Sequence, residues 1–181
     1  MSSPDTSPAG WLLGDIGNSR VKLVWLAGGR ESAEQIWREL AERQVEEVSY
    51  QPMTLWNARL TLPTGRIAEQ TAALTAFLAD KKLGGIWLSS VNGEAAQQLV
   101  SMLDQVLETH ENEDVDGSMI ASAADVFVPN LLQKPDKTGA DRALAVRAAL
   151  RLNHGQGRGI VVLSGTALTV EWIDADANWA G

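Results

Sequence analysis

The chain has 181 residues, 45% of them hydrophobic and 21% charged, which is typical of a globular protein with one large domain or two small lobes and argues against disorder. Its 15 basic and 23 acidic residues give a net charge of −8 at neutral pH, which repels phosphate backbones and argues against direct nucleic-acid binding. The absence of cysteine excludes disulfides, thiolate metal sites and a cysteine nucleophile, and two histidines leave little for a histidine-rich metal centre.

The ten N-terminal residues, MSSPDTSPAG, are rich in serine and proline, so we expect a frayed tail over residues 1–10. They lack the basic start of a signal peptide, and the apolar segment that follows is interrupted by Asp15 and Asn18. No run of about 18 or more apolar residues occurs, so neither a membrane span nor a membrane partner is expected. The expected location is the cytoplasm.

Up to residue 85, apolar runs alternate with segments of helical spacing. Two apolar runs flank the polar turn Asn18-Ser19 and predict a β-hairpin. The break Pro63-Thr64-Gly65 separates an alternating run from one with helical periodicity. The expected elements are strands at 11–17 and 21–27, a helix at 31–45, a strand at 55–62 and a helix at 66–81.

From residue 86 on, the same alternation continues. An apolar run bounded by Asn92-Gly93 predicts a buried strand, and the acidic stretch ENEDVDG predicts a solvated loop. Strands that alternate with helices in this way predict an α/β fold. The expected elements are a strand at 86–91, a helix at 94–109, a loop at 111–117, a strand at 126–129, a helix at 138–153 and a hairpin made of 159–165 and 168–174.

The two predicted hairpins resemble each other. When LLGDIGNSRVKLVW is laid over VVLSGTALTVEW, Gly17 is opposite Gly165, and Asp15 then faces Leu163. Both segments consist of a buried strand, a polar turn that contains glycine, and a second strand. The repeat favours two related lobes that hold a ligand between their turns, although two unrelated hairpins can share this pattern by chance.

The segment DIGNSRVK (15–22) places a carboxylate at the end of a strand, beside a Gly-Asn-Ser turn. Glycine lets a ligand approach the backbone closely, while Asn18 and Ser19 offer hydrogen-bond donors for phosphate oxygens. The Asp15 carboxylate can hold Mg²⁺ directly or through water. The same residues also fit an ordinary hairpin turn in which Asp15 has only a capping role.

Two later segments could serve the same chemistry. SGTALT (164–169) is the matching turn of the second hairpin, with small and hydroxyl residues that suit phosphate contact. TGADRALAV (138–146) opens a helix with Asp141 in its first turn, where the helix dipole stabilises negative charge. There Asp141 could accept a proton from a substrate hydroxyl, and Arg142 could hold an anionic substrate. A capping aspartate next to a solvated arginine is the alternative.

Taken together, DIGNSRVK, PDKTGADR and SGTALTVEW resemble, in order and spacing, the motifs of the type III pantothenate kinases, the family that includes the Bvg accessory factor proteins. SSVN (89–92) resembles the strand end before that family's second helix. The resemblance covers residues 11–181 and implies a duplicated actin-like, sugar-kinase-like (ribonuclease H-like) architecture. It implies a first lobe at 11–135 and, at 136–181, a linking helix with the start of an incomplete second lobe.

The resemblance implies ATP-dependent phosphorylation of pantothenate to 4'-phosphopantothenate, the first step of coenzyme A biosynthesis. It makes Asp141 the catalytic base and places Mg²⁺ near Asp15. A monovalent cation, K⁺ or NH₄⁺, and a homodimer are also implied. The implied ATP-binding residues are Asp15, Ile16, Gly17, Asn18, Ser19, Arg20, Val21, Lys22 and Thr166, and the implied substrate-binding residues are Gly139, Ala140, Asp141 and Arg142.

Three departures from the family pattern bear on activity. Leu163 stands where the second phosphate motif normally begins with the aspartate that binds the monovalent cation, and Leu132 stands where a substrate-contacting tyrosine is common. The family also continues beyond the position of Gly181, so we expect either a fragment or a divergent homologue that relies on a partner. We therefore expect impaired turnover. The alternative is a non-catalytic nucleotide- or pantothenate-binding protein, or a regulatory homologue.

Overall fold

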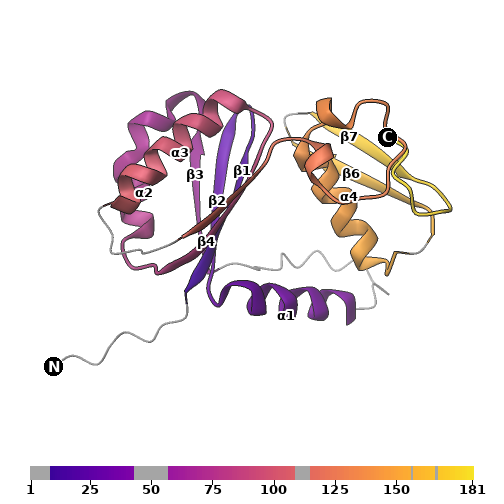
Figure 1. The fold of residues 1–181 in the computed structure, drawn as a ribbon, viewed down its shortest axis with the longest axis horizontal. Coiled ribbons are helices and arrows are strands. Elements are labelled where there is room, and N and C mark those ends of the chain that lie inside the picture. Colours follow the sequence, from indigo (N-terminus) through magenta and orange to yellow (C-terminus); the bar gives the residue numbers. More distant parts are fainter. Residues whose placement is uncertain (1–8, 43–56, 109–114, 156, 166) are drawn as a thin grey trace.

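The computed structural model describes residues 9–42, 57–108, 115–155, 157–165 and 167–181. Within these residues the chain forms a five-stranded sheet and a two-stranded sheet. Figure 1 shows the two sheets in separate lobes, the larger from the N-terminal part of the chain and the smaller from the C-terminal part. Most of the predicted tail and the position of Thr166 lie outside the described residues, whereas Gly10 is already the first residue of a strand.

The larger sheet has the strand order β3-β2-β1-β4-β5. The first three strands form an antiparallel meander, while β4 pairs parallel with β1 and β5 pairs parallel with β4. The register places Asp15 of β1 between Lys22 of β2 and Ser89 of β4, at the carboxyl end of the parallel strands. The strands are β1 (Gly10–Ile16), β2 (Arg20–Leu26), β3 (Ala58–Pro63), β4 (Leu83–Ser90) and β5 (Asp116–Ile120).

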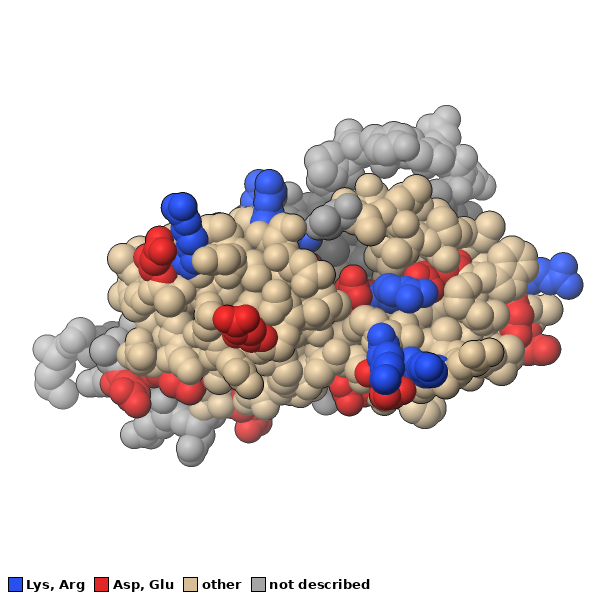
Figure 2. Space-filling view, turned by 90° about the horizontal axis from the view of Figure 1, so that it is seen from above, with Lys and Arg blue, Asp and Glu red and all other residues tan. Residues whose placement is uncertain are grey.

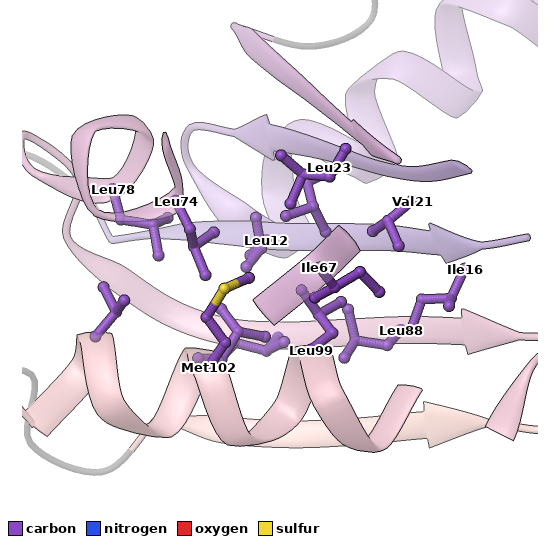
Figure 3. Close-up of a cluster of buried hydrophobic side chains, with 14 of the residues drawn as sticks. Leu12, Ile16, Val21, Leu23, Ile67, Leu74, Leu78, Leu88, Leu99 and Met102 are labelled. Atoms are coloured by element: carbon purple, nitrogen blue, oxygen red, sulfur yellow. The ribbon is translucent and has the colours of Figure 1, made fainter. Parts of the chain in front are cut away.

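One face of this sheet is covered by the 3₁₀ segment η1 (Thr64–Gln70) and by the helices α2 (Thr71–Leu78) and α3 (Gly93–Glu108) (Figure 1). Apolar residues three or four positions apart give each helix one stripe that faces the sheet. Figure 3 shows this core, which includes Leu12, Ile16, Val21, Leu23, Ile67, Leu74, Leu78, Leu88, Leu99 and Met102.

The remaining helix of the larger lobe, α1 (Gly29–Glu42), follows β2 and lies apart from the covered face. A three-stranded meander, extended by two parallel strands that are joined through helices, is the arrangement of a ribonuclease H-like lobe. The predicted α/β class and the actin-like, sugar-kinase-like fold are therefore confirmed.

The smaller lobe packs helix α4 (Ala140–Leu152) against the hairpin of β6 (Gly159–Ser164) and β7 (Leu168–Ile173) (Figure 1). Two short 3₁₀ segments, η2 (Ala123–Asp125) and η3 (Pro135–Lys137), precede the helix. The division of the chain at 135 and 136 stays a prediction. The lobe has a buried cluster of its own, made of Ala123, Val126, Val128, Ala143, Val146, Leu150, Ile173 and Trp179.

The β6–β7 hairpin buries only one of its faces. On β7, Glu171 and Ile173 point inward and are buried, while their neighbours point outward. A continuous exposed apolar surface marks a contact site more often than a free surface. We call this surface the outer hairpin face; its side chains, each at least 46% exposed, are Ile160, Val162, Leu168, Val170 and Trp172.

Several sequence-based boundaries in the larger lobe are wrong, and β4 already begins at Leu83, three residues before the strand predicted at 86–91. The helix predicted at 66–81 is a 3₁₀ segment up to Gln70, with a non-helical backbone at Arg66 (φ −141°, ψ 30°), and an α-helix only over Thr71–Leu78. The loop predicted at 111–117 overlaps β5, which begins at Asp116. That strand is mostly exposed and polar, so only its pairing with β4, and not its pattern, makes it a strand.

The strand predicted at 126–129 is also wrong. Val126 and Val128 are buried, as alternate residues of an extended chain would be. No residue of 126–129 belongs to a strand, and the next residue, Asn130, forms only an isolated β-bridge with Trp179. Its apolar alternation reflects packing against the cluster of the smaller lobe and not a sheet ladder.

None of the described helices is both long and apolar enough to cross a membrane. On the face that Figure 2 shows, acidic and basic side chains are interspersed and do not form a basic stripe.

Candidate active site

The β1–β2 hairpin presents the predicted phosphate-binding segment at the carboxyl end of β1. Asp15 Oδ2 and Lys22 Nζ are 3.3 Å apart, and the two side chains are 45% and 62% exposed. The Gly17 N–H donates to the Arg20 carbonyl over 3.0 Å, and Thr64 Oγ1 donates to the Gly17 carbonyl over 2.9 Å. These bonds fix the turn, while the two charges beside it stay accessible to a ligand.

A cavity of about 830 Å³ opens beside this hairpin, on the sheet face that α2 and α3 leave uncovered. Its wall is apolar where Trp11 and Trp87 lie, with ring centroids 6.1 Å apart. It is polar where Asp15, Lys22 and Ser89 line it. Side chains of α1 and α4 also line it. The cavity therefore joins an apolar wall to the charged end of the sheet.

The start of α4 lies at the same end of the sheet. Val91, which follows β4, donates its N–H to the Ile16 carbonyl over 3.1 Å. A Cβ atom on Gly139, the residue before α4, would be 3.1 Å from Val91 Cγ1 and would clash with Asp141 Oδ1. A side chain at this position would therefore displace the Asp141 carboxylate. The exposed Asp141 carboxylate lies beside the Gly139 backbone, close to the ends of β1 and β4.

A second cavity, of about 900 Å³, is bounded by the end of β4, the start of α3 and the segment that leads into α4. Ser90 Oγ donates to the Asn92 carbonyl over 2.9 Å, and Asn92 Oδ1 accepts the Ala95 N–H over 3.1 Å as the N-terminal cap of α3. Lys137 and Gly139 also line the cavity. The SSVN segment forms, as expected, the end of β4 and the link to α3.

Arg142 forms a buried ion pair. Its Nε and Nη2 atoms donate to Glu171 Oε1 and Oε2 over 2.5 and 2.8 Å, and Trp179 Nε1 donates to Glu171 Oε2 over 2.8 Å. Glu171 and Trp179 are fully buried, while the Arg142 side chain is 33% exposed. The guanidinium carbon also lies 5.7 Å from the centroid of the Trp179 ring. Arg142 is therefore not simply a solvated residue, because it joins α4 to β7.

These contacts shift both ionisation equilibria of the pair. Burial raises the pKa of the Glu171 carboxyl, but the hydrogen bonds from Arg142 and Trp179, together with the charge of Arg142, lower it more, so that the pKa lies below its ordinary value. The hydrogen bond to Glu171 raises the pKa of the Arg142 guanidinium. Both groups are therefore charged at neutral pH.

The second hairpin differs from the first at its turn. The Gly165 N–H closes the turn through a hydrogen bond of 3.1 Å to the backbone. The strand registers leave residues 165–167 in this turn and residues 17–20 in the turn of the first hairpin. Leu163 is half-buried in β6. The second hairpin therefore has no carboxylate at the position that Asp15 occupies in the first.

The family model of the type III pantothenate kinases matches residues 11–181. The chain belongs to the type III pantothenate kinase family. Among curated relatives, the type III pantothenate kinase of Stenotrophomonas maltophilia (strain K279a) is 33% identical over 172 residues, a match that covers 94% of this chain and 55% of that protein. The relative from Rhodopirellula baltica is 27% identical over 175 residues, with 92% and 58% covered.

The chain thus spans a little over half the length of these curated relatives. Among solved structures, the Aquifex aeolicus member of the Ppx/GppA family aligns with 93% of this chain and 48% of that chain, with a TM-score of 0.37 and 13% identity.

In this member of the kinase family, the hairpin residues that resemble the ATP-binding motif fall into two groups. Asn18, Ser19 and Arg20 are exposed at the turn. Ile16 and Val21 are fully buried in the core of the larger lobe. A ligand at the turn can therefore contact the last two only through their backbone.

The other predicted site residues are distributed as follows. Ala140 is fully buried in the first turn of α4, next to the exposed Asp141. Leu132 packs against the buried cluster of the smaller lobe. Sequence reasoning missed Glu171 and Trp179. The available signal was a single carboxylate in the run LTVEW. Because apolar and polar residues alternate there, the pattern predicts that Leu168, Val170 and Trp172 point inward and that Glu171 is exposed, which is the reverse of what the structure shows.

We predict that Glu171→Gln lowers the free energy of unfolding by on the order of 3 kcal/mol near pH 7, because it leaves the Arg142 charge without a carboxylate partner. The pKa of Glu171 is depressed in the folded state, so the stabilisation is complete above the pKa of an unfolded glutamate and is lost as the pH falls through the folded value. The difference between wild type and variant should shrink below about pH 4, the ordinary range of glutamate. Urea unfolding of both proteins at a series of pH values measures this difference in the free energy of unfolding.

The control is Asp80→Asn, which removes an exposed carboxylate that pairs with Lys81 on the larger lobe and should leave the stability nearly unchanged. A difference between wild type and Glu171→Gln that stays constant down to pH 3 would contradict the prediction.

Proposed function

We propose that this chain serves the ATP-dependent phosphorylation of pantothenate, in the cytoplasm. The observation that carries the proposal is the position of Asp141, held through Gly139 and Val91 at the end of the sheet where Asp15 and Lys22 lie. Asp141 has a carboxylate that can accept the proton of a hydroxyl, and the turn beside Asp15 and Lys22 can bind phosphate. These two groups come from segments far apart in the sequence. Family membership supports the same reaction.

The first hairpin would hold the nucleotide phosphates. Lys22 is a point charge that suits phosphate oxygens, and Asn18 and Ser19 offer donors at the turn. Asp15 offers one carboxylate oxygen pair at the end of β1, next to this turn. This fits Mg²⁺, which takes one or two carboxylates and completes its shell with water and phosphate oxygens. Bound there, it would offset the negative charge of the phosphates.

Asp141 would be the base. Its exposed carboxylate accepts the proton of the primary hydroxyl while the hydroxyl oxygen bonds to the γ-phosphorus, and the bond from that phosphorus to the bridging oxygen of the leaving ADP breaks. The cavity beside Gly139 offers space for pantothenate, and the exposed Lys137 supplies a positive charge for its carboxylate. Positioning and charge neutralisation account for most of the catalysis in such a step.

Binding without turnover, or a regulatory role based on it, is the second candidate, and Leu163 favours it. A leucine side chain has no oxygen ligand, so it does not fit the monovalent cation that the family resemblance implies at this position. Loss of one electrostatic contact to the transition state costs on the order of 10²–10³ in rate. We propose that turnover is slow for this reason.

The first test of function uses Asp141→Asn, which removes the base but keeps the shape of the side chain. We expect 4'-phosphopantothenate formation, measured by mass spectrometry, to fall by about 10²–10⁴ relative to the wild type. Calorimetry should show little change in Mg·ATP binding for this variant and weaker binding for Asp15→Ala. Asp104→Asn, on the exposed side of α3, is the matched control. If Asp141→Asn turned over at the wild-type rate, the base would be another group; ligand binding without any product from the wild type would favour the second candidate.

A second test addresses the cation. We expect potassium to leave the activity of the wild type unchanged, because Leu163 provides no ligand. Leu163→Asp should introduce potassium-dependent turnover, and Leu163→Asn, with a neutral oxygen, is the control for the charge. The measurement is the initial rate of each protein in a potassium salt, compared with its rate in the salt of a large organic cation. Strong stimulation of the unmodified chain by potassium would refute this interpretation of Leu163.

We also propose that the chain forms a homodimer through the outer hairpin face. Five exposed apolar side chains on one small surface favour association. Light scattering after size exclusion should give a dimer at micromolar concentration. Val162→Lys should shift it to a monomer, while Leu152→Lys, an exposed apolar position on α4, should not. A monomeric wild type would contradict the proposal.

A further inference from the structure

Glu171 is an unusual residue in this chain. Among the residues whose side chains the structure describes, it is the only charged one that is fully buried. Replacing a buried ion pair by apolar residues is often neutral or even stabilising, so such a pair is weak evidence for a role in stability alone. The position of Glu171 on β7, in contact with the first turn of α4, suggests what else it does.

The carboxylate of Glu171 has a fixed orientation. Arg142 Nε and Nη2 bind one oxygen each, and Trp179 Nε1 binds Oε2 from a third direction. Trp179 is held in turn by its backbone, because its N–H donates to the Pro129 carbonyl and its carbonyl accepts the Leu131 N–H, both over 2.8 Å. The carboxylate therefore cannot turn without breaking several hydrogen bonds.

We propose that Glu171 is a positioning residue that fixes the orientation of the Arg142 guanidinium next to Asp141. The Nε–Nη2 edge is held by Glu171, whereas Nη1 has no hydrogen-bond partner among the described residues, and a third of the side chain is exposed. Nη1 is thus the group left to donate to an anionic or polar substrate. This role rests on the proposed function and on the family resemblance, which implies that Arg142 and Asp141 bind the substrate together.

The physical gain is pre-organisation. A free arginine has several rotatable bonds, and fixing it on binding costs affinity. With Glu171 in place, most of that ordering has already occurred when the protein folds. The same ion pair holds the first turn of α4, and with it Asp141, against the strand that leaves the 165–167 turn.

The orientation is tested without any ligand by nuclear magnetic resonance of the arginine side chains. When a guanidinium is held at one edge, rotation about its Cζ–Nε bond is slow and Nη1 and Nη2 give separate signals. We expect separate signals for Arg142 in the wild type and a single averaged signal in Glu171→Gln. Trp179→Phe, which removes one hydrogen bond but keeps an aromatic ring at this buried position, should give intermediate behaviour and serves if Glu171→Gln does not fold. Trp172→Phe, the next residue of β7 but on the outer face, is the matched control.

The substrate role is then tested by titration with pantothenate. We expect binding to Glu171→Gln to be about tenfold weaker than to the wild type, Mg·ATP binding to be unchanged, and pantothenate to shift the Nη1 signal of the wild type. Averaged Arg142 signals in the wild type, or equal pantothenate affinities of wild type and Glu171→Gln, would overturn the proposal. Separate signals in a wild type that binds no pantothenate would contradict the proposed function and leave the orientation of Arg142 by Glu171 standing.

Discussion

The parallel pairing of β1 with β4 determines where the charged groups of this chain meet. Parallel strands bring their carboxyl ends to one edge of the sheet, and ligands of α/β proteins bind at such edges. Asp15 lies at the end of β1, and Val91, just after β4, hydrogen-bonds to Ile16 and packs against Gly139. If β4 were shifted along β1, the start of α4 would move away from the first hairpin, and Asp141 with it.

The smaller lobe depends on a polar interaction of the same importance. Its apolar cluster packs α4 on the β6–β7 hairpin. Apolar packing alone, however, fixes neither the rotation of a helix about its axis nor its position along that axis. The buried pair between Arg142 and Glu171 has a defined geometry and therefore determines both. The helix that carries the proposed base is thereby tied to the hairpin that carries the second turn.

The two hairpins illustrate how a repeated element can diverge in function. In the first, the inward face is covered by α2 and α3, and the other face carries Asp15 and Lys22. In the second, one face packs on α4, the other is apolar and exposed, and Leu163 replaces the carboxylate. The charged side chains suited to phosphate chemistry are therefore concentrated in the first hairpin and at the start of α4.

The sequence by itself determined the α/β alternation, both hairpins and the family, because strand and helix periodicities and short glycine-containing motifs are local properties. It also indicated Asp15, Asp141 and Arg142 through their motifs. Tertiary structure alone decided that β5 is a strand, since its polar residues are paired only through β4. It likewise decided that Arg142 is bound by Glu171 and Trp179, which are 29 and 37 positions away. A hydrogen bond between distant residues depends on how the lobes fold, and no local pattern records it.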